Sequence, residues 1–150
     1  MLTDIRHYLP ITPTLATAGQ PTAAQFAAIR QAGFEVVVNL ALPTSDHALP
    51  DERAVVAAQG MAYYAIPVQW EQPTVEDFQQ FQAVMARHGG QKIFVHCALN
   101  MRVSAFVYLH RRLAGVDAPT ATATLHQIWQ PNEVWAQFIE AVLGDRPEAL

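Results

Sequence analysis

Hydrophobic and polar positions alternate in blocks along the chain. Short apolar runs, rich in valine and bounded by turn residues, predict buried strands at 34–40, 61–68 and 93–96, and residues 12–18 predict an opening edge strand. The segments between these runs carry apolar residues at helical spacing. This strand–helix alternation predicts an α/β fold with a central, mainly parallel sheet of four or five strands and helices on both faces.

Capping residues mark the starts of the predicted helices. Thr22 with Gln25 has the spacing of a capping box, and Thr74 is followed by Asp77 in the same way. Glycines mark several ends. The helices are predicted to run from Thr22 to Ala32, from 50–52 to Gly60, from Thr74 to 88–90, from Val103 to Leu113, from Asp117 or Thr120 onward, and from Asn132 onward.

Composition limits the classes of protein to consider. With 150 residues, of which 51% are hydrophobic and 15% charged, the chain fits one globular domain over 1–150. Its net charge of −4 and the lack of any Lys/Arg run argue against a nucleic-acid partner. No apolar stretch is long enough for a bilayer span, and the N-terminal residues lack a signal-peptide core. We therefore expect a cytoplasmic protein without a membrane partner; the oligomeric state stays open.

The single cysteine, Cys97, stands in the segment KIFVHCALNMRVS, residues 92–104. It follows a buried strand, and a four-residue loop leads from it to Arg102 and an apolar helix. The carboxyl end of a strand is where open α/β sheets bind ligands, and the following helix directs its N-terminal N–H groups to the same place. Both features favour a thiolate, which is the nucleophilic form. Arg102 carries a planar fork of donors suited to two phosphoryl oxygens.

These residues resemble a known family. His96, Cys97, Arg102 and Ser104 look like the signature loop of cysteine-dependent tyrosine and dual-specificity phosphatases. The upstream run ATAGQPTAAQFAAIRQAGFEVVVNL and a strand ending in IPV resemble a bacterial branch of tyrosine-phosphatase-like proteins, whose relatives occur as domains beside β-lactamase-like hydrolases. The resemblance covers roughly residues 12–110. It implies a tyrosine/dual-specificity phosphatase-like fold and hydrolysis of phosphomonoesters, either phosphotyrosine or small phosphorylated molecules.

The resemblance also implies roles for individual residues. Cys97 would attack phosphorus and form a phosphocysteine, and Ser104 would hydrogen-bond the thiolate. His96 would orient the loop. The phosphate would be held by Arg102 and the backbone N–H groups of Ala98, Leu99, Asn100, Met101 and Arg102. Gln20 would lie near the site within the turn Gly19-Gln20-Pro21. From its place at the end of a strand, and apart from the resemblance, Asn39 is expected to stabilise that turn by hydrogen bonds.

The loop departs from the usual pattern in two ways. Four residues rather than five separate Cys97 from Arg102, a gap that also occurs in some bacterial relatives. Asn100 replaces the usual glycine, and asparagine tolerates a left-handed backbone better than most residues.

The general acid has several candidates. Glu71 is the only carboxylate in the loop 69–73, which corresponds to the family's acid loop. Asp77 is the alternative, although its position three residues after Thr74 is also that of a helix cap. A site without an acid is the third option.

Two other functions fit the same segment. A rhodanese-like sulfurtransferase also uses a cysteine in a short loop before a basic residue, and a non-catalytic pseudophosphatase would bind phosphate-like anions without turnover. The histidines show no metal-ligand spacing, so neither a metal nor a cofactor is expected. The expected partner is a phosphorylated protein or small molecule.

Overall fold

A five-stranded sheet in the order β1-β2-β5-β3-β4 forms the middle layer of the protein. The computed structural model describes residues 1–144. β2, β5, β3 and β4 are mutually parallel, and only β1 pairs antiparallel, with β2. The strands are β1 (Leu9–Thr12), β2 (Leu15–Ala18), β3 (Val36–Asn39), β4 (Ala62–Ala65) and β5 (Ile93–His96). The predicted α/β fold with a mainly parallel sheet is confirmed.

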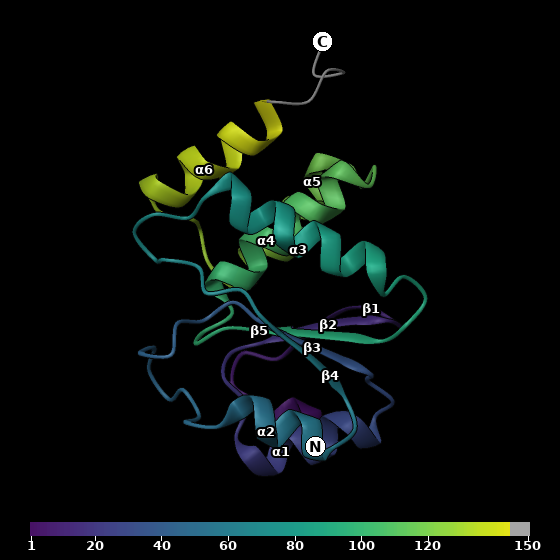
Figure 1. The fold of residues 1–150 in the computed structure, drawn as a ribbon. Coiled ribbons are helices and arrows are strands. Elements are labelled where there is room, and N and C mark those ends of the chain that lie inside the picture. Colours follow the sequence, from purple (N-terminus) through teal and green to yellow (C-terminus); the bar gives the residue numbers. More distant parts are fainter. Residues whose placement is uncertain (145–150) are drawn as a thin grey trace.

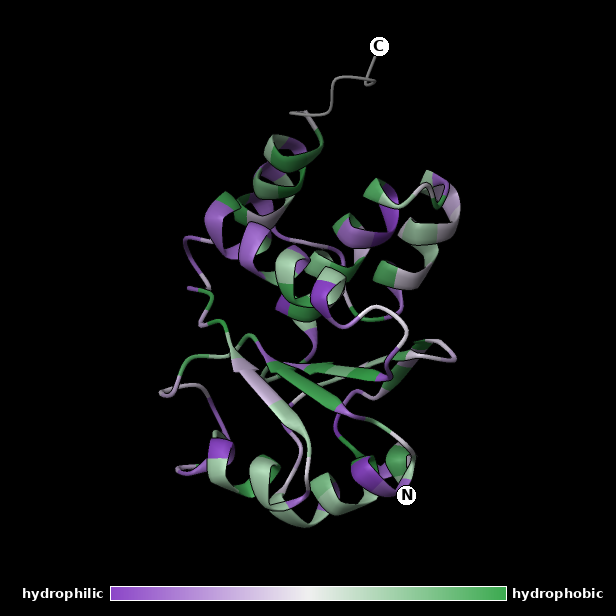
Figure 2. Ribbon diagram, turned by 45° about the vertical axis from the view of Figure 1, so that its right-hand side comes forward, coloured by the Kyte–Doolittle hydropathy of each residue, from purple (hydrophilic) through white to green (hydrophobic). Residues whose placement is uncertain are grey.

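Helices cover both faces of this sheet (Figure 1). One face carries η1 (Leu2–Asp4), α1 (Ala23–Gln31) and α2 (Glu52–Ala58), and the other carries α3 (Val75–Arg87), α4 (Met101–Leu113), α5 (Ala118–His126) and α6 (Glu133–Gly144). Figure 2 shows the hydrophobic residues concentrated in the central strands between the layers. Among residues 1–144, no helix has the length and apolar character that a bilayer span requires.

The predicted helix starts agree with the observed caps. Thr22 forms a complete capping box with Gln25, and the Thr74 hydroxyl accepts the backbone N–H of Asp77. Asp117, rather than Thr120, caps α5. Asn132 Oδ1 accepts the N–H of Trp135 at 3.0 Å, as expected for the last helix. These local hydrogen bonds satisfy N–H groups that helix starts leave free.

Several predicted boundaries were wrong. The strands predicted at 34–40 and 61–68 are shorter, at Val36–Asn39 and Ala62–Ala65. The expected edge strand 12–18 is the second half of a hairpin: Thr12 ends β1, which forms the edge, and Leu15–Ala18 form β2, which lies between β1 and β5. Pro10 has no N–H to donate, which suits an edge strand. The helix predicted from Val103 begins two residues earlier, at Met101. Arg102 therefore lies in the first turn of α4.

The two faces of the sheet bury separate hydrophobic clusters, because successive side chains of a strand point to opposite faces. In β5, Ile93 and Val95 belong to the cluster under α3, α4 and α6, whereas Phe94 belongs to the cluster over α1 and α2. The parallel strands all end at the same edge of the sheet, where Asn39 pairs in register with His96. This edge carries the residues that follow.

Candidate active site

The alternation of β5 sets the direction of Cys97. Cys97 continues the series of Ile93 and Val95 and joins the hydrophobic cluster on the α4 side, while His96 packs against Phe26 of α1 at 5.9 Å between ring centroids. The Cys97 side chain is almost fully covered by its neighbours, yet it lines an open cavity of about 310 Å³. Cys97 therefore borders an open cavity, although most of its surface is packed against the hydrophobic cluster.

The loop from Ala98 to Arg102 presents five consecutive backbone N–H groups. Within the described part of the chain, none of these five groups donates to a backbone or side-chain acceptor, and the first returning bond is Ser104 N–H to Asn100 O at 2.8 Å. Buried N–H groups normally find partners, so an unpaired series at a helix start is a site for an anion. The structure thus brings together the residues predicted to hold phosphate.

Asn100 gives the loop its shape. Its φ of 67° lies in the left-handed region, as expected for the residue that replaces a glycine. Its side chain is buried, and Nδ2 donates to His7 O at 2.9 Å and to Thr17 Oγ1 at 3.0 Å. These two bonds fix the turn to the N-terminal segment and to β2.

Arg102 is a buried cation without a carboxylate partner among residues 1–144. Its Nη1 donates to Val68 O at 3.1 Å, and its Nη2 donates to Ser45 Oγ at 3.4 Å. The side chain lines the same cavity as Cys97. A positive charge in the first turn of a helix opposes the helix dipole, so the placement is favourable only with an anion nearby.

Ser104 does not occupy the position that the resemblance implied. Its hydroxyl donates to Met101 O at 2.8 Å and accepts from Trp129 Nε1 at 2.9 Å. The one hydroxyl proton is thus committed to the preceding turn of α4. In the described residues Ser104 makes no hydrogen bond to Cys97, so the expected contact with the thiolate is not formed.

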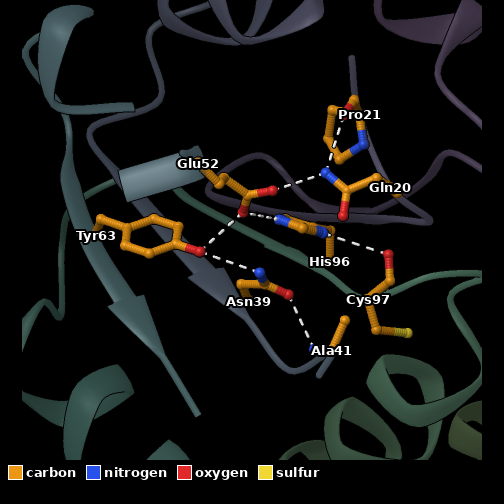
Figure 3. A network of polar contacts seen from close by, with 8 residues as sticks. All are labelled: Gln20, Pro21, Asn39, Ala41, Glu52, Tyr63, His96 and Cys97. Carbon is orange, nitrogen blue, oxygen red and sulfur yellow. Dashed lines mark hydrogen bonds and ion pairs between the residues drawn. The ribbon is translucent and has the colours of Figure 1, made fainter. Parts of the chain in front are cut away.

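His96 anchors a buried polar network behind the loop (Figure 3). Its Nε2 donates to Glu52 Oε2 at 2.6 Å, and its Nδ1 lies 3.3 Å from Cys97 O. Gln20 Nε2 donates to Glu52 Oε1 at 2.7 Å, and the Tyr63 hydroxyl donates to Glu52 Oε2 at 3.0 Å. The Cys97 sulfur points away from the network, which therefore holds the backbone of the site rather than its reacting atom.

The network also sets the charge state of Glu52. Burial alone would raise the pKa of this carboxyl, but hydrogen bonds from His96, Gln20 and Tyr63, with the charge of His96, lower it. The pKa of Tyr63 is raised, mainly by burial and also by the neighbouring carboxylate. Glu52 is thus held as an anion inside the protein.

Gln20 lies beside the cysteine loop, as the resemblance implied, whereas within the part of the chain that the structure describes Asn39 makes no hydrogen bond to the Gly-Gln-Pro turn that it was expected to stabilise. The backbone N–H of Gln20 donates to Ala98 O at 3.0 Å, which ties the Gly-Gln-Pro turn to the loop. Asn39 Oδ1 accepts the N–H of Ala41 at 2.8 Å, and its Nδ2 donates to the Tyr63 hydroxyl at 3.0 Å. Both residues therefore support backbone around the site.

Glu52 and Tyr63 belong to this network, although nothing in the sequence singles them out. Glu52 was expected only as a first-turn residue of α2, and Tyr63 only as a strand residue. In the sequence, Tyr63 is only an amphipathic residue of a predicted strand and Glu52 only an acidic residue at a predicted helix start. Their meeting depends on the strand order, which no local pattern gives.

The carboxylates around the cavity differ from the prediction. Glu71 is exposed, and neither it nor Asp77 is among the described residues that line the cavity. The cavity wall is instead formed by Leu42, Thr44, Ser45, Asp46, Trp70, Ala98, Leu99 and Met101, together with Cys97 and Arg102. Asp46 is the one carboxylate in this set.

Comparison with known proteins decides the family. The family model described as "DSP-PTPase phosphatase fused to NAD+ Kinase" matches residues 12–134. The chain belongs to this family. The predicted resemblance to bacterial tyrosine-phosphatase-like proteins is thereby confirmed.

A curated relative supports the same branch. The "Beta-lactamase hydrolase-like protein" of Agrobacterium fabrum (strain C58) is 32% identical over 108 residues, which are 70% of this chain and 25% of that protein. The chain therefore spans about a quarter of that relative's length.

Solved structures show the DSP-PTPase fold directly. A DUF442 protein from Shewanella putrefaciens CN-32 superposes with a TM-score of 0.85 at 34% identity, with 95% of each chain covered. The core catalytic domain of the PP-IP phosphatase SIW14 from S. cerevisiae gives 0.75 at 13% identity, covering 91% of this chain and 85% of that one. TpbA from P. aeruginosa, in complex with pTyr, gives 0.65 at 19% identity, covering 89% and 83%. The last two show likeness of fold alone.

Proposed function

We propose that this protein is a cysteine-dependent phosphatase that hydrolyses phosphomonoesters through a phosphocysteine intermediate on Cys97. The observation that carries the proposal is the anion site beside the thiol. Five unpaired backbone N–H groups and the buried Arg102 guanidinium surround the cavity that Cys97 lines. A phosphoryl group supplies the negative oxygens that these donors lack.

Arg102 is prepared to hold a phosphoryl group. A guanidinium has five N–H donors, and the bonds to Val68 O and Ser45 Oγ use two of them. The remaining donors are free for phosphoryl oxygens, and the two protein contacts keep the fork from turning. Charge spreads over the three equatorial oxygens in phosphoryl transfer, so a preoriented cation stabilises the transition state more than the ground state.

The chemical sequence uses the thiolate twice. In the first step the Cys97 sulfur attacks phosphorus as the ester oxygen leaves; in the second, water attacks phosphorus and the thiolate leaves. The N–H groups of 98–102 hold the phosphoryl oxygens throughout. Ser104 takes no part in this scheme, because its hydroxyl proton is bonded to Met101 O.

The apolar part of the cavity wall favours an apolar or aromatic group beyond the phosphate. Leu42, Leu99 and Met101 line it, together with Trp70. The Trp70 ring is supported by Trp129 and Trp135, at centroid distances of 5.3 and 5.8 Å. An exposed indole held from behind is a surface on which a planar group can stack. Phosphotyrosine and small aryl or apolar phosphomonoesters fit this arrangement.

Two assays on one preparation test the proposal against its alternatives. We expect wild-type protein to hydrolyse p-nitrophenyl phosphate and Cys97→Ser to be inactive although folded. Transfer of sulfur from thiosulfate to cyanide without phosphate release would instead indicate a rhodanese-like enzyme. Tight vanadate or phosphate binding with no turnover would indicate a pseudophosphatase.

A further inference from the structure

The cavity that holds Cys97 has a carboxylate in its wall that the resemblance did not identify. Asp46 lies in the loop between β3 and α2, far from the loop 69–73 where an acid was expected. Among the described residues that line the cavity, it is the only one with a carboxyl group. We propose that Asp46 donates the proton to the leaving group, an inference that rests on the proposed phosphatase function.

The loop that carries Asp46 is tied to the anion site itself. Its neighbour Ser45 accepts a hydrogen bond from Arg102 Nη2 at 3.4 Å. The same Oγ accepts the N–H of Leu42 at 2.9 Å, so one hydroxyl joins both the loop backbone and the guanidinium. Arg102 and Asp46 therefore line the same cavity from linked segments. A phosphate ester held by Arg102 would place its leaving oxygen in the cavity that Asp46 lines.

Further bonds give this loop a defined course. Ala41 N–H is held by Asn39 Oδ1 at 2.8 Å at the start of the loop, and Ala48 N–H donates to Ser45 O at 3.1 Å on the far side of Asp46. His47 adopts a φ of 65°, which turns the chain directly after Asp46. The carboxyl group is thus presented from a short turn that is closed on both sides.

The carboxyl group itself is uncommitted. Within residues 1–144, the Asp46 side chain takes part in no hydrogen bond or ion pair, and it is exposed at the cavity. Glu71 is exposed and is not among the lining residues, and Asp77 lies in the first turn of α3.

The proton balance of the two steps follows. When the Cys97 sulfur forms its bond to phosphorus, the bond between phosphorus and the ester oxygen breaks, and the Asp46 carboxyl gives its proton to that oxygen. The alcohol or phenol leaves, and Asp46 is a carboxylate. In the second step this carboxylate takes a proton from the attacking water, the sulfur–phosphorus bond breaks, and phosphate and the thiolate are released.

Substrates with different leaving groups test the assignment. A poor leaving group, as in phenyl phosphate, needs the proton, whereas 2,4-dinitrophenolate leaves without it. We expect Asp46→Asn to lower kcat/KM for phenyl phosphate by about 10²–10³-fold and to leave kcat/KM for 2,4-dinitrophenyl phosphate nearly unchanged, because kcat/KM reports the phosphorylation step, in which the acid acts. Vanadate affinity should equal that of the wild type, which a general disturbance of the loop would not allow. The matched control, Asp51→Asn, removes an exposed carboxylate at the end of the same loop and should retain both activities.

The results of these assays distinguish a failure of the Asp46 assignment from a failure of the proposed phosphatase function. If the wild type turns over both substrates in a Cys97-dependent manner and Asp46→Asn behaves like it, the assignment is wrong and the phosphatase stands. An equal loss of kcat/KM on both substrates, or a selective loss of kcat/KM for phenyl phosphate in Glu71→Gln instead, also overturns it. Failure of the wild type to hydrolyse either substrate would remove the proposed function and this inference together.

Discussion

His96 Nε2 lies 2.6 Å from Glu52 Oε2, in a pair with both side chains buried. The contact joins the strand that leads into Cys97 to the first turn of α2, on the face of the sheet away from the thiol. Glu52 also accepts from Gln20, whose backbone N–H holds Ala98 O. The Glu52 carboxylate thus supports the cysteine loop through two residues, His96 and Gln20.

Removal of this charge should destabilise the protein. Glu52→Gln keeps the size of the side chain but leaves a buried imidazole without its anionic acceptor. We expect the free energy of unfolding in urea to fall by about 2 kcal/mol, in the range of hydrogen bonds to charged groups. Glu76→Gln, an exposed change in the first turn of α3, is the control and should stay within about 0.5 kcal/mol. Equal effects of the two substitutions would show that the network contributes nothing.

Because the pKa of Glu52 is lowered in the folded protein, the free energy of unfolding should decrease at acidic pH. The ordinary pKa of this carboxyl is 4.5, and in the folded protein it is lower. As the pH falls, the Glu52 carboxylate of the unfolded chain is therefore protonated before that of the folded protein. The contribution of Glu52 to the free energy of unfolding is complete above pH 4.5 and is lost as the pH falls through the folded pKa. Unfolding free energies of the wild type between pH 7 and 3 should drop more steeply than those of Glu52→Gln. Parallel curves would contradict the lowered pKa.

Gly19 is needed because the cysteine loop passes against it. A Cβ at this position would lie 2.5 Å from Ala98 O and 3.2 Å from Arg6 O, both of them backbone atoms. Gly19→Ala should therefore push the loop out of place, with a loss of about 1–3 kcal/mol in stability and a fall in kcat for p-nitrophenyl phosphate. In Gly89→Ala the added Cβ would meet only Ala86 O, at an ordinary 3.6 Å. This control should fold and react like the wild type; a similar loss in both would refute the close approach.

Arg102→Lys separates the charge of the guanidinium from its shape. Lysine keeps the cation but cannot hold Val68 O and Ser45 Oγ while it also presents two parallel donors to an anion. We expect kcat to fall by about 10²-fold and vanadate to bind more weakly. Arg87→Lys, at the exposed end of α3, should change neither quantity. Unaltered vanadate affinity in Arg102→Lys would mean that the fork does not grip the anion.

Local signals predicted much of this structure. The helix caps Thr22, Thr74 and Asn132 could be predicted from the sequence because each capping hydrogen bond joins residues only three positions apart. The two-residue period of β5 predicts that Cys97 and His96 point to opposite faces once both faces are covered. The anion-binding loop from Ala98 to Arg102 could be predicted because the strand, the loop and the helix follow one another directly in the sequence.

Contacts between residues far apart in the sequence could not be predicted in this way. His96 and Glu52 are 44 residues apart, and Glu52 could have faced solvent in another strand order. Asp46 reaches the cavity only because β3 lies beside β5 in the sheet. The Ser104 hydroxyl could bond either the sulfur or the Met101 carbonyl, and the start of α4 at Met101 selected the latter.

The most direct test of the central claim is the detection of the covalent intermediate. Wild-type protein is mixed with p-nitrophenyl phosphate, denatured within milliseconds and digested, and the peptides are weighed by mass spectrometry. We predict the added mass of one phosphoryl group on the peptide that contains Cys97, and none in Cys97→Ser. Phosphate on another residue, or undiminished release of p-nitrophenol by Cys97→Ser, would contradict the account.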